Sequence, residues 1–167
     1  MSCLGVLFSL DKETVLKLKS YESDQERLDF LQEEIEADIM TNQPEMFAEL
    51  VHSWDALHRS LTDGKLEWTN GNYPLNQVVL GGERIYHQDN YIMSLKTPED
   101  VQRIAETIST ISHQELEKGY SRIAAEDYGM DTTIEDFEDT WIWFQESLEF
   151  WKKAAAERRF VLFTADQ

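Results

Sequence analysis

The sequence has few cysteines, prolines and glycines, and these shortages exclude several classes of protein. Cys3 is the one cysteine among 167 residues, so no internal disulfide can form and the disulfide-stapled class of secreted domains is excluded. Three prolines and seven glycines punctuate the chain, and it contains no linker, low-complexity segment or internal repeat. We therefore expect a cytoplasmic protein that folds around its own hydrophobic core.

Basic residues and long apolar runs are also scarce. The 15 Lys and Arg residues stand against 33 Asp and Glu residues, which gives a formal charge of −18 at pH 7. A surface this negative repels phosphate backbones and anionic lipids, so we expect neither nucleic acid nor a membrane as a partner. No apolar run approaches the roughly 20 residues of a membrane-spanning helix, and the N-terminus lacks the pattern of an export signal. The charge favours a basic protein partner, or else it serves only solubility.

Apolar and aromatic residues, in contrast, are plentiful. Apolar residues make up 41% of the chain and include five Trp, six Tyr and eight Phe. Each buried aromatic ring removes about 150 to 250 Å² from water. A chain of this length can bury roughly two thirds of its unfolded surface without disulfides or metals. We expect one compact domain.

Short apolar runs near both ends of the chain predict a small sheet. Residues 3–10 read as a buried strand, and residues 160–163 as a second strand that pairs with the first. Residues 83–95 look extended. Residues 75–80 fit either a helical turn or a strand.

Helical spacing of apolar residues predicts most of the remaining chain to be helical. A brief helix is expected at residues 12–19, and a longer one after Ser23 or Asp24, with apolar residues every three or four positions. These residues are Leu28, Leu31, Ile35 and Ile39. The same spacing predicts a third helix over residues 47–61, which ends near Gly64 because glycine accommodates the left-handed C-cap.

The clearest helix start in the sequence begins at Thr97. Thr97 can cap the helix, the proline after it is tolerated at the first helical position, and Asp100 closes a capping box. Ser112 repeats the capping-box spacing ahead of a short helix. A long amphipathic helix follows Thr132 or Thr133, with an apolar stripe at spacings of three and four. The stripe consists of Ile134, Phe137, Trp141, Phe144, Leu148 and Trp151.

Three motifs follow one another along the chain: WDALHRSLTDG at residues 54–64, PLNQVVLGG at residues 74–82, and a TPEDV helix start at Thr97. In these motifs, and in a terminal strand after an aromatic-rich helix, the chain resembles the YfbM-like family, which is catalogued as a domain of unknown function. The resemblance covers nearly the whole chain. It implies a single YfbM-like domain over residues 1–167 with an α+β fold, mostly helical, whose small sheet includes the N- and C-terminal strands. It implies no established reaction, cofactor or catalytic residues.

No constellation of residues predicts catalysis or metal binding. His58 shares an apolar helix face with Trp54, where a histidine is more often structural than a base or ligand. His52 lies six residues earlier, so the pair lacks the i, i+4 geometry of a helical metal site. Gly81-Gly82 lacks the frame of a phosphate-binding loop, and no serine or cysteine has an identifiable base. We therefore expect neither a cofactor nor a metal, and an interaction protein rather than an enzyme.

The leading hypothesis is a non-enzymatic, immunity-type inhibitor that binds a basic toxin or effector domain. Complementary charge would speed encounter, and aromatic side chains would hold the complex. The residues expected to contact the partner lie on the long helix. Trp143 and Phe150 fall off its apolar stripe, and Asp136 and Asp139 carry negative charge.

Two alternatives stay open. A cleft beside residues 54–82 could bind a small molecule or carry out a reaction. It would be lined by His58, Trp68, Tyr73 and Tyr86. Such a site predicts an apolar cavity with convergent polar groups and a perturbed pKa. The acidic surface could instead mimic the charge of a nucleic acid, which requires carboxylates at phosphate-like spacing. The sequence leaves the oligomeric state open.

Overall fold

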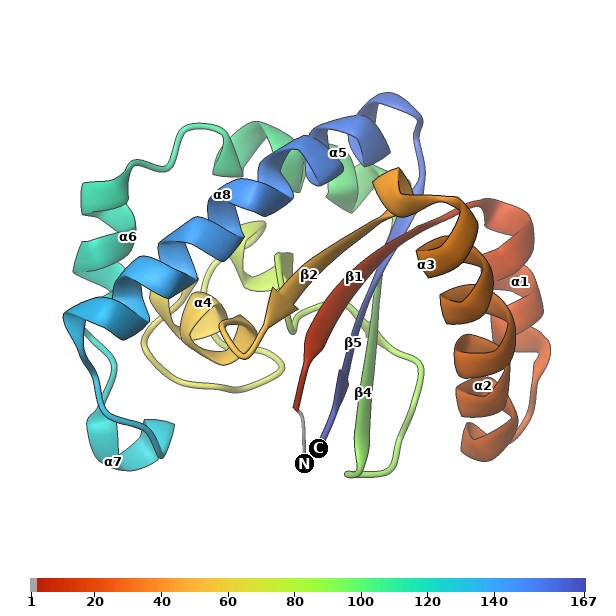
Figure 1. The fold of residues 1–167 in the computed structure, drawn as a ribbon, viewed down its shortest axis with the longest axis horizontal. Helices are drawn as coiled ribbons and strands as arrows, with labels where there is room; N and C mark the ends of the chain where they lie inside the picture. Colours follow the sequence, from red (N-terminus) through yellow and green to blue (C-terminus); the bar gives the residue numbers. More distant parts are fainter. Residues whose placement is uncertain (1–2) are drawn as a thin grey trace.

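A five-stranded antiparallel sheet forms the centre of the protein. The computed structural model describes residues 3–167, and its strands stand in the order β2-β1-β5-β4-β3 (Figure 1). Their bounds are Gly5–Leu10 for β1, Phe47–Val51 for β2, Glu83–Arg84 for β3, Tyr91–Lys96 for β4 and Phe160–Asp166 for β5. β1 and β5 pair along the whole of β1, from Gly5 with Ala165 to Leu10 with Phe160. The predicted pairing of the terminal strands is confirmed.

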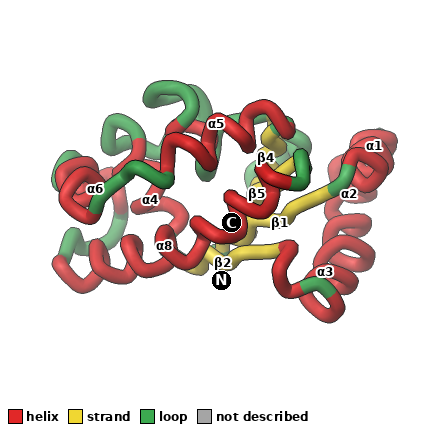
Figure 2. Tube along the Cα trace, turned by 90° about the horizontal axis from the view of Figure 1, so that it is seen from above, coloured by secondary structure: helices red, strands yellow, loops and turns green. Residues whose placement is uncertain are grey.

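Helices lie on both sides of the sheet and give the molecule three layers (Figure 2). One side carries α1 (Lys12–Ser20) and a continuous helical segment made of α2 (Asp24–Phe30), the π-helix η1 (Leu31–Glu36) and α3 (Ala37–Asn42). The other side carries α4 (Trp54–Leu61), α5 (Pro98–Ile108), α6 (His113–Tyr120), the short α7 (Ala125–Tyr128) and α8 (Ile134–Ala156). Within residues 3–167, no helix is both long enough and apolar enough to cross a bilayer.

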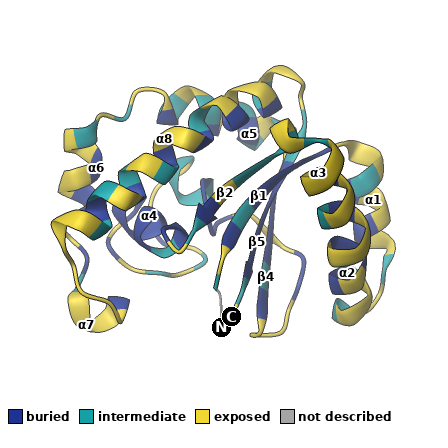
Figure 3. Ribbon diagram, in the orientation of Figure 1, coloured by how far each residue is buried: buried dark blue, intermediate teal, exposed yellow. Residues whose placement is uncertain are grey.

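The sheet separates two hydrophobic cores. Leu7 and Phe163 belong to the core shared with α4, α5, α6 and α8. Phe8 and Leu162, their neighbours along the strands, belong to the core shared with α1, α2 and α3. Successive side chains of a strand point to opposite faces, so the central strands are buried on both sides while the outer helix faces are exposed (Figure 3). The α+β fold expected from the sequence is confirmed.

The capped helix starts follow the sequence prediction. Thr97, Ser112 and Thr133 each accept a hydrogen bond from the backbone N–H three residues on, at 3.2, 3.1 and 3.0 Å. These caps begin α5, α6 and α8. Most of the predicted apolar stripe of α8 is buried or half-buried, but Ile134 is 78% exposed. It is the first residue of α8, where the helix begins to emerge from its loop.

The predicted helix over residues 47–61 is wrong in its first part. Phe47–Val51 form the strand β2, which pairs with β1 at the edge of the sheet, and α4 begins only at Trp54. A short apolar run fits a strand and a buried helix equally well. Pairing with β1, which is remote in sequence, decides between them. Gly64 follows α4 as expected, with a φ of +94°.

The predicted helix after Ser23 forms, but it is not α-helical throughout. Ser23 caps α2 by accepting a hydrogen bond from the backbone of Glu26 at 3.1 Å. The segment Leu31–Glu36 is a π-helix, in which each backbone hydrogen bond spans five residues. The predicted apolar face is still buried and consists of Leu28, Leu31, Ile35 and Ile39. Because π-helical turns often accompany functional sites, the cavity beside this one is of interest.

Residues 62–82, between α4 and β3, contain little regular structure. Residues 75–80 follow the helical-turn alternative, since they begin with the 3₁₀ turn η3 (Leu75–Gln77). Another 3₁₀ turn, η2 (Pro44–Met46), leads into β2. Gly82 has a φ of +138°, and a Cβ there would lie 2.6 Å from the Leu95 carbonyl oxygen. Glycine therefore lets the end of this stretch pack directly against β4.

Candidate functional site

His58 lies in a buried hydrogen-bond network that joins α4 to the loop after it. Its Nε2 donates to Asn70 Oδ1 over 2.8 Å, and the residue is 1% exposed. Asn70 Nδ2 in turn donates to the Asp63 carboxylate at 2.6 Å, to Thr62 Oγ1 at 3.1 Å and to the Lys65 carbonyl at 2.8 Å. Burial lowers the pKa of His58, and the hydrogen bond with Asn70 opposes this effect. The ring is therefore placed to hold the loop against α4.

The other residues expected to line a small-molecule cleft have separate partners. Trp68 packs beneath the guanidinium of an arginine on β3, which lies 5.1 Å from its ring centroid. Tyr73 is exposed and donates to a carboxylate on α5 at 2.7 Å, while Tyr86 is buried and donates to an asparagine side chain at 2.9 Å. Five cavities within residues 3–167 are lined by other residues. His58, Trp68, Tyr73 and Tyr86 do not line any of these five.

Lys96 is a buried ionisable residue that the sequence analysis missed. It is 0% exposed, its Nζ donates to the Val79 carbonyl and, over 2.8 Å, to Ser94 Oγ, and it lies 5.6 Å from the Phe163 ring centroid. Burial lowers the pKa of Lys96 well below its usual range, which favours the neutral amine. Strand alternation could have revealed it, because Lys96 falls on the same face of β4 as Ile92, which packs in the α4–α8 core.

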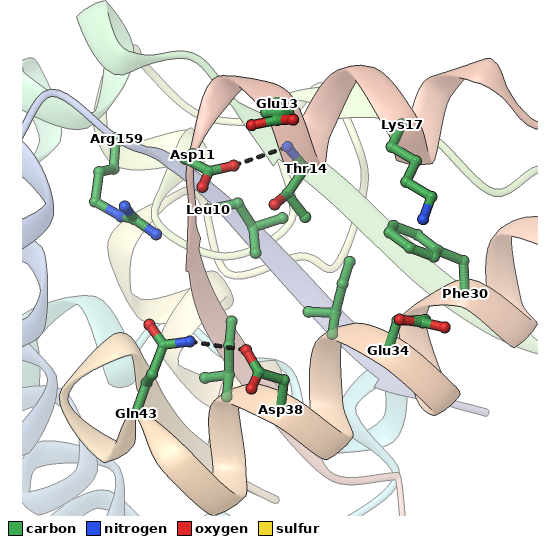
Figure 4. A pocket seen from close by; sticks show the side chains of 12 residues that line it. Leu10, Asp11, Glu13, Thr14, Lys17, Phe30, Glu34, Asp38, Gln43 and Arg159 are labelled. Atoms are coloured by element: carbon green, nitrogen blue, oxygen red, sulfur yellow. Dashed lines mark hydrogen bonds between the residues drawn. The ribbon is translucent and has the colours of Figure 1, made fainter.

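A cavity of about 490 Å³ lies between α1 and η1 (Figure 4). Apolar, acidic and basic side chains all line it: Leu10, Phe30, Ile35 and Ile39; Asp11, Glu13, Glu34 and Asp38; Lys17 and Arg159. Several of the polar groups already have partners. Asp11 accepts a backbone hydrogen bond that caps α1, which lowers the pKa of Asp11, and Gln43 donates to Asp38 at 2.8 Å. The cavity can accept a small polar molecule, but its lining, as far as residues 3–167 form it, has no histidine, cysteine or serine for nucleophilic chemistry.

A second cavity of about 410 Å³, the β2–α8 groove, lies between the edge strand β2 and the C-terminal half of α8. Its lining combines apolar and acidic side chains: Phe47, Ala48, Trp143 and Phe150; Glu45, Glu49, Glu146 and Glu149. Within residues 3–167, none of these glutamates makes a salt bridge. The one lysine in the lining, Lys153, pairs with Glu157 at 2.9 Å. The groove thus carries aromatic surface beside negative charge that no salt bridge neutralises.

Two of the residues expected to contact a partner meet in the β2–α8 groove. Trp143 is half-buried, and Phe150 is only 6% exposed because it packs edge-on against Trp151, with ring centroids 5.8 Å apart. Phe150 is therefore largely covered by its neighbours, while Trp143 exposes more of its side chain to a partner. Asp139 is exposed but lies outside this lining.

Asp136, in contrast, makes hydrogen bonds to other side chains of the protein. Its Oδ2 accepts hydrogen bonds from the hydroxyls of Tyr120 at 2.7 Å and Tyr128 at 2.8 Å. Burial, followed by the bond to Asp136, raises the pKa of both tyrosines. The carboxylate therefore ties α6 and α7 to the start of α8. Asp136 thus has a structural role in the fold, and its contact with a partner stays a prediction.

No cluster of three or more His, Cys, Asp or Glu side chains within residues 3–167 is placed to hold a metal ion. The cavity beside η1 and the β2–α8 groove both combine charged and apolar side chains in their linings.

The comparisons with known proteins agree with the fold. The crystal structure of YfbM from Escherichia coli, a protein of unknown function, matches with a TM-score of 0.65 and 17% sequence identity, over 97% of this chain and 99% of that chain. The family model DUF1877, a domain of unknown function, matches residues 1–164. The chain belongs to the DUF1877 family. This confirms the resemblance to the YfbM-like family found in the sequence motifs. No curated protein matches the sequence.

Proposed function

We propose that this DUF1877 protein is a non-enzymatic, acidic interaction protein, of the type that acts as an immunity inhibitor by binding a basic toxin or effector domain. The observation that carries the proposal is the β2–α8 groove, in which Trp143 lies among four glutamates that make no salt bridge with any other residue in the range 3–167. Aromatic residues at the centre of an interface supply much of its binding energy. Unpaired carboxylates at the rim favour a cationic partner.

The charge of the whole molecule supports the same proposal. A formal charge of −18 on 167 residues creates a negative potential that accelerates encounter with basic proteins and slows encounter with acidic ones. Such steering weakens as salt shortens the Debye length to about 8 Å at physiological ionic strength. A salt-dependent association with a basic protein is therefore the expected behaviour.

Affinity capture with the tagged protein, from lysate at low and at high salt, tests this proposal. We expect a basic protein to be enriched at low salt and released as salt rises, with its identity read by mass spectrometry. If the captured protein is a toxin or an enzyme, its activity should fall when the complex is reconstituted from purified components. Failure to enrich any basic protein at low salt would contradict the proposal.

A small-molecule function is the second candidate, and the π-helix favours it. η1 supplies Glu34 and Ile35 to the cavity of about 490 Å³ beside α1, a size within the range of about 300 to 1,000 Å³ common for ligand sites. This cavity is distinct from the cleft near His58 that the sequence predicts, and that cleft stays a separate prediction. Native mass spectrometry of the freshly purified protein tests the small-molecule function, since a retained metabolite should add a discrete mass that Glu34→Trp, a bulky substitution at an exposed position of the cavity lining, abolishes.

A further inference from the structure

We propose that the β2–α8 groove recognises arginine in particular, by stacking a guanidinium of the basic partner on the Trp143 indole and pairing it with the glutamates around the groove. This inference rests on the proposed function and adds the chemistry of the contact. The occupant is an arginine side chain presented by a surface segment of the partner. The groove's lining, its charge and its size carry the inference.

The lining places one aromatic surface between two sources of carboxylates. Trp143, Glu146, Phe150 and Lys153 recur at spacings of three and four on α8, so they lie on one face of the helix, toward β2. β2 contributes Glu49 on the opposite wall. A planar cation that enters the groove can therefore meet the indole and carboxylates at the same time.

The carboxylates of the groove have no salt-bridge partner within residues 3–167. Four glutamates line the groove, and its one lysine, Lys153, is already bound to Glu157 at 2.9 Å. That pairing raises the pKa of Lys153. Like charges gathered around one groove repel one another, and a bound cation weakens this repulsion.

Arginine fits these features better than lysine does. Its guanidinium is planar, stacks on aromatic faces and binds carboxylates through two parallel hydrogen bonds, whereas the ammonium of lysine is a compact and strongly hydrated charge. The protein itself combines the same groups elsewhere. The Arg59 guanidinium lies 5.6 Å from the Tyr128 ring centroid while its Nε donates to the Asp55 carboxylate at 2.6 Å.

The size of the groove limits what can enter. A volume of about 410 Å³ lies at the lower end of the range of about 300 to 1,000 Å³ that suits small ligands. It has room for a few side chains and not for a whole helix. An arginine that projects from the partner's surface satisfies this limit.

Titration of the full-length protein with fluorescently labelled nona-arginine and nona-lysine peptides at low salt tests the inference. We expect nona-arginine to bind more tightly, and Trp143→Leu to weaken nona-arginine binding by about twofold to thirtyfold, the range of cation–π contributions, with little effect on nona-lysine. A charge-neutralised groove variant, E45Q/E49Q/E146Q/E149Q, should weaken both peptides. Circular dichroism and the melting temperature establish that each variant is folded.

A matched variant separates recognition in the groove from attraction to the whole molecule. E22Q/E26Q/E33Q/E126Q removes the same number of charges from exposed positions outside the groove. We expect it to weaken nona-arginine binding less than the groove variant does. Equal losses in the two variants would overturn the site, and equal responses of both peptides to Trp143→Leu would overturn the arginine preference. Either result leaves the proposed function standing if affinity capture yields a basic partner, whereas a capture without one removes the proposed function itself.

Discussion

Lys96 is a lysine in the hydrophobic interior, where within residues 3–167 no carboxylate forms a salt bridge with it. Its donors reach the Val79 carbonyl and Ser94 instead. A buried amine favours its neutral form because water no longer solvates the charge. In the unfolded chain the same amine returns to its ordinary pKa and binds a proton, so the stability of the fold depends on pH through this residue.

We predict that Lys96→Met removes this pH dependence. Between the lowered pKa of the folded state and the ordinary value of 10.5, the unfolded state binds one proton more than the native state, so native stability rises with pH. In that window the free energy of unfolding of the wild type should gain about 1.4 kcal/mol per pH unit relative to the variant. Urea unfolding of both proteins at several pH values from neutral upward measures the difference, and parallel curves would contradict it.

Asn70 is a second residue whose importance the structure reveals. It joins His58 to Asp63 and to the loop backbone, and it is 8% exposed. Asn70→Ala should lower the free energy of unfolding by about 1 to 3 kcal/mol, because the buried His58 Nε2 loses its partner. Asn72→Ala, at an exposed position in the same loop, is the control and should change stability by less than about 0.5 kcal/mol. Similar losses in both variants would argue against the network.

At the scale of the elements, α6 approaches α4 closely at Gly119. A Cβ on Gly119 would lie 1.9 Å from the Ser60 carbonyl oxygen, so the two helices must separate to accommodate any side chain. We expect Gly119→Ala to destabilise the protein by about 1 to 3 kcal/mol, as overpacking does. The neighbouring exposed substitution Lys118→Ala should be nearly neutral. Thermal unfolding compares the two, and an unchanged melting temperature for Gly119→Ala would show that α6 shifts freely.

Asp136 joins three helices through two tyrosine hydroxyls, and its charge should be visible in their titration. Asp136→Asn removes the negative charge that disfavours the phenolates, so the pKa values of Tyr120 and Tyr128 should fall toward the ordinary value of 10.0. Burial should keep them above it. Ultraviolet absorbance of the phenolates during an alkaline titration measures the change. Asp139→Asn, at an exposed position on the same helix, is the control and should leave the tyrosine titration unaltered.

The elements that could be predicted from sequence are those whose signals are local. The caps at Thr97, Ser112 and Thr133 bond to backbone only three residues away, so a short window contains both partners. Phe47–Val51 could not be assigned in this way, because their strand depends on β1. Trp143 was found because it breaks the stripe of α8, but the groove beside it needs β2, which the sequence analysis placed in a helix.

At the scale of the whole molecule, the excess of acidic residues should make stability depend on salt. Like charges repel within the folded state, and this repulsion weakens as the Debye length falls from about 30 Å at 0.01 M to about 8 Å at 0.15 M ionic strength. We expect the melting temperature to rise over this range, by about 2 to 4 °C for each kcal/mol of repulsion relieved. The E22Q/E26Q/E33Q/E126Q variant should show a smaller rise. A melting temperature that falls with salt would contradict the repulsion.

The pairing of β1 with β5 also has a consequence for how the chain reaches its fold. β5, near the C-terminal end of residues 3–167, lies between β1 and β4 and holds the two halves of the sheet together. Contacts between segments so distant in sequence raise the contact order, which slows folding because a long loop must close first. During synthesis, β1 leaves the ribosome well before β5, and in that interval its neighbour β2 can pair with it but β5 cannot. The sheet can therefore be completed only after β5 has been translated.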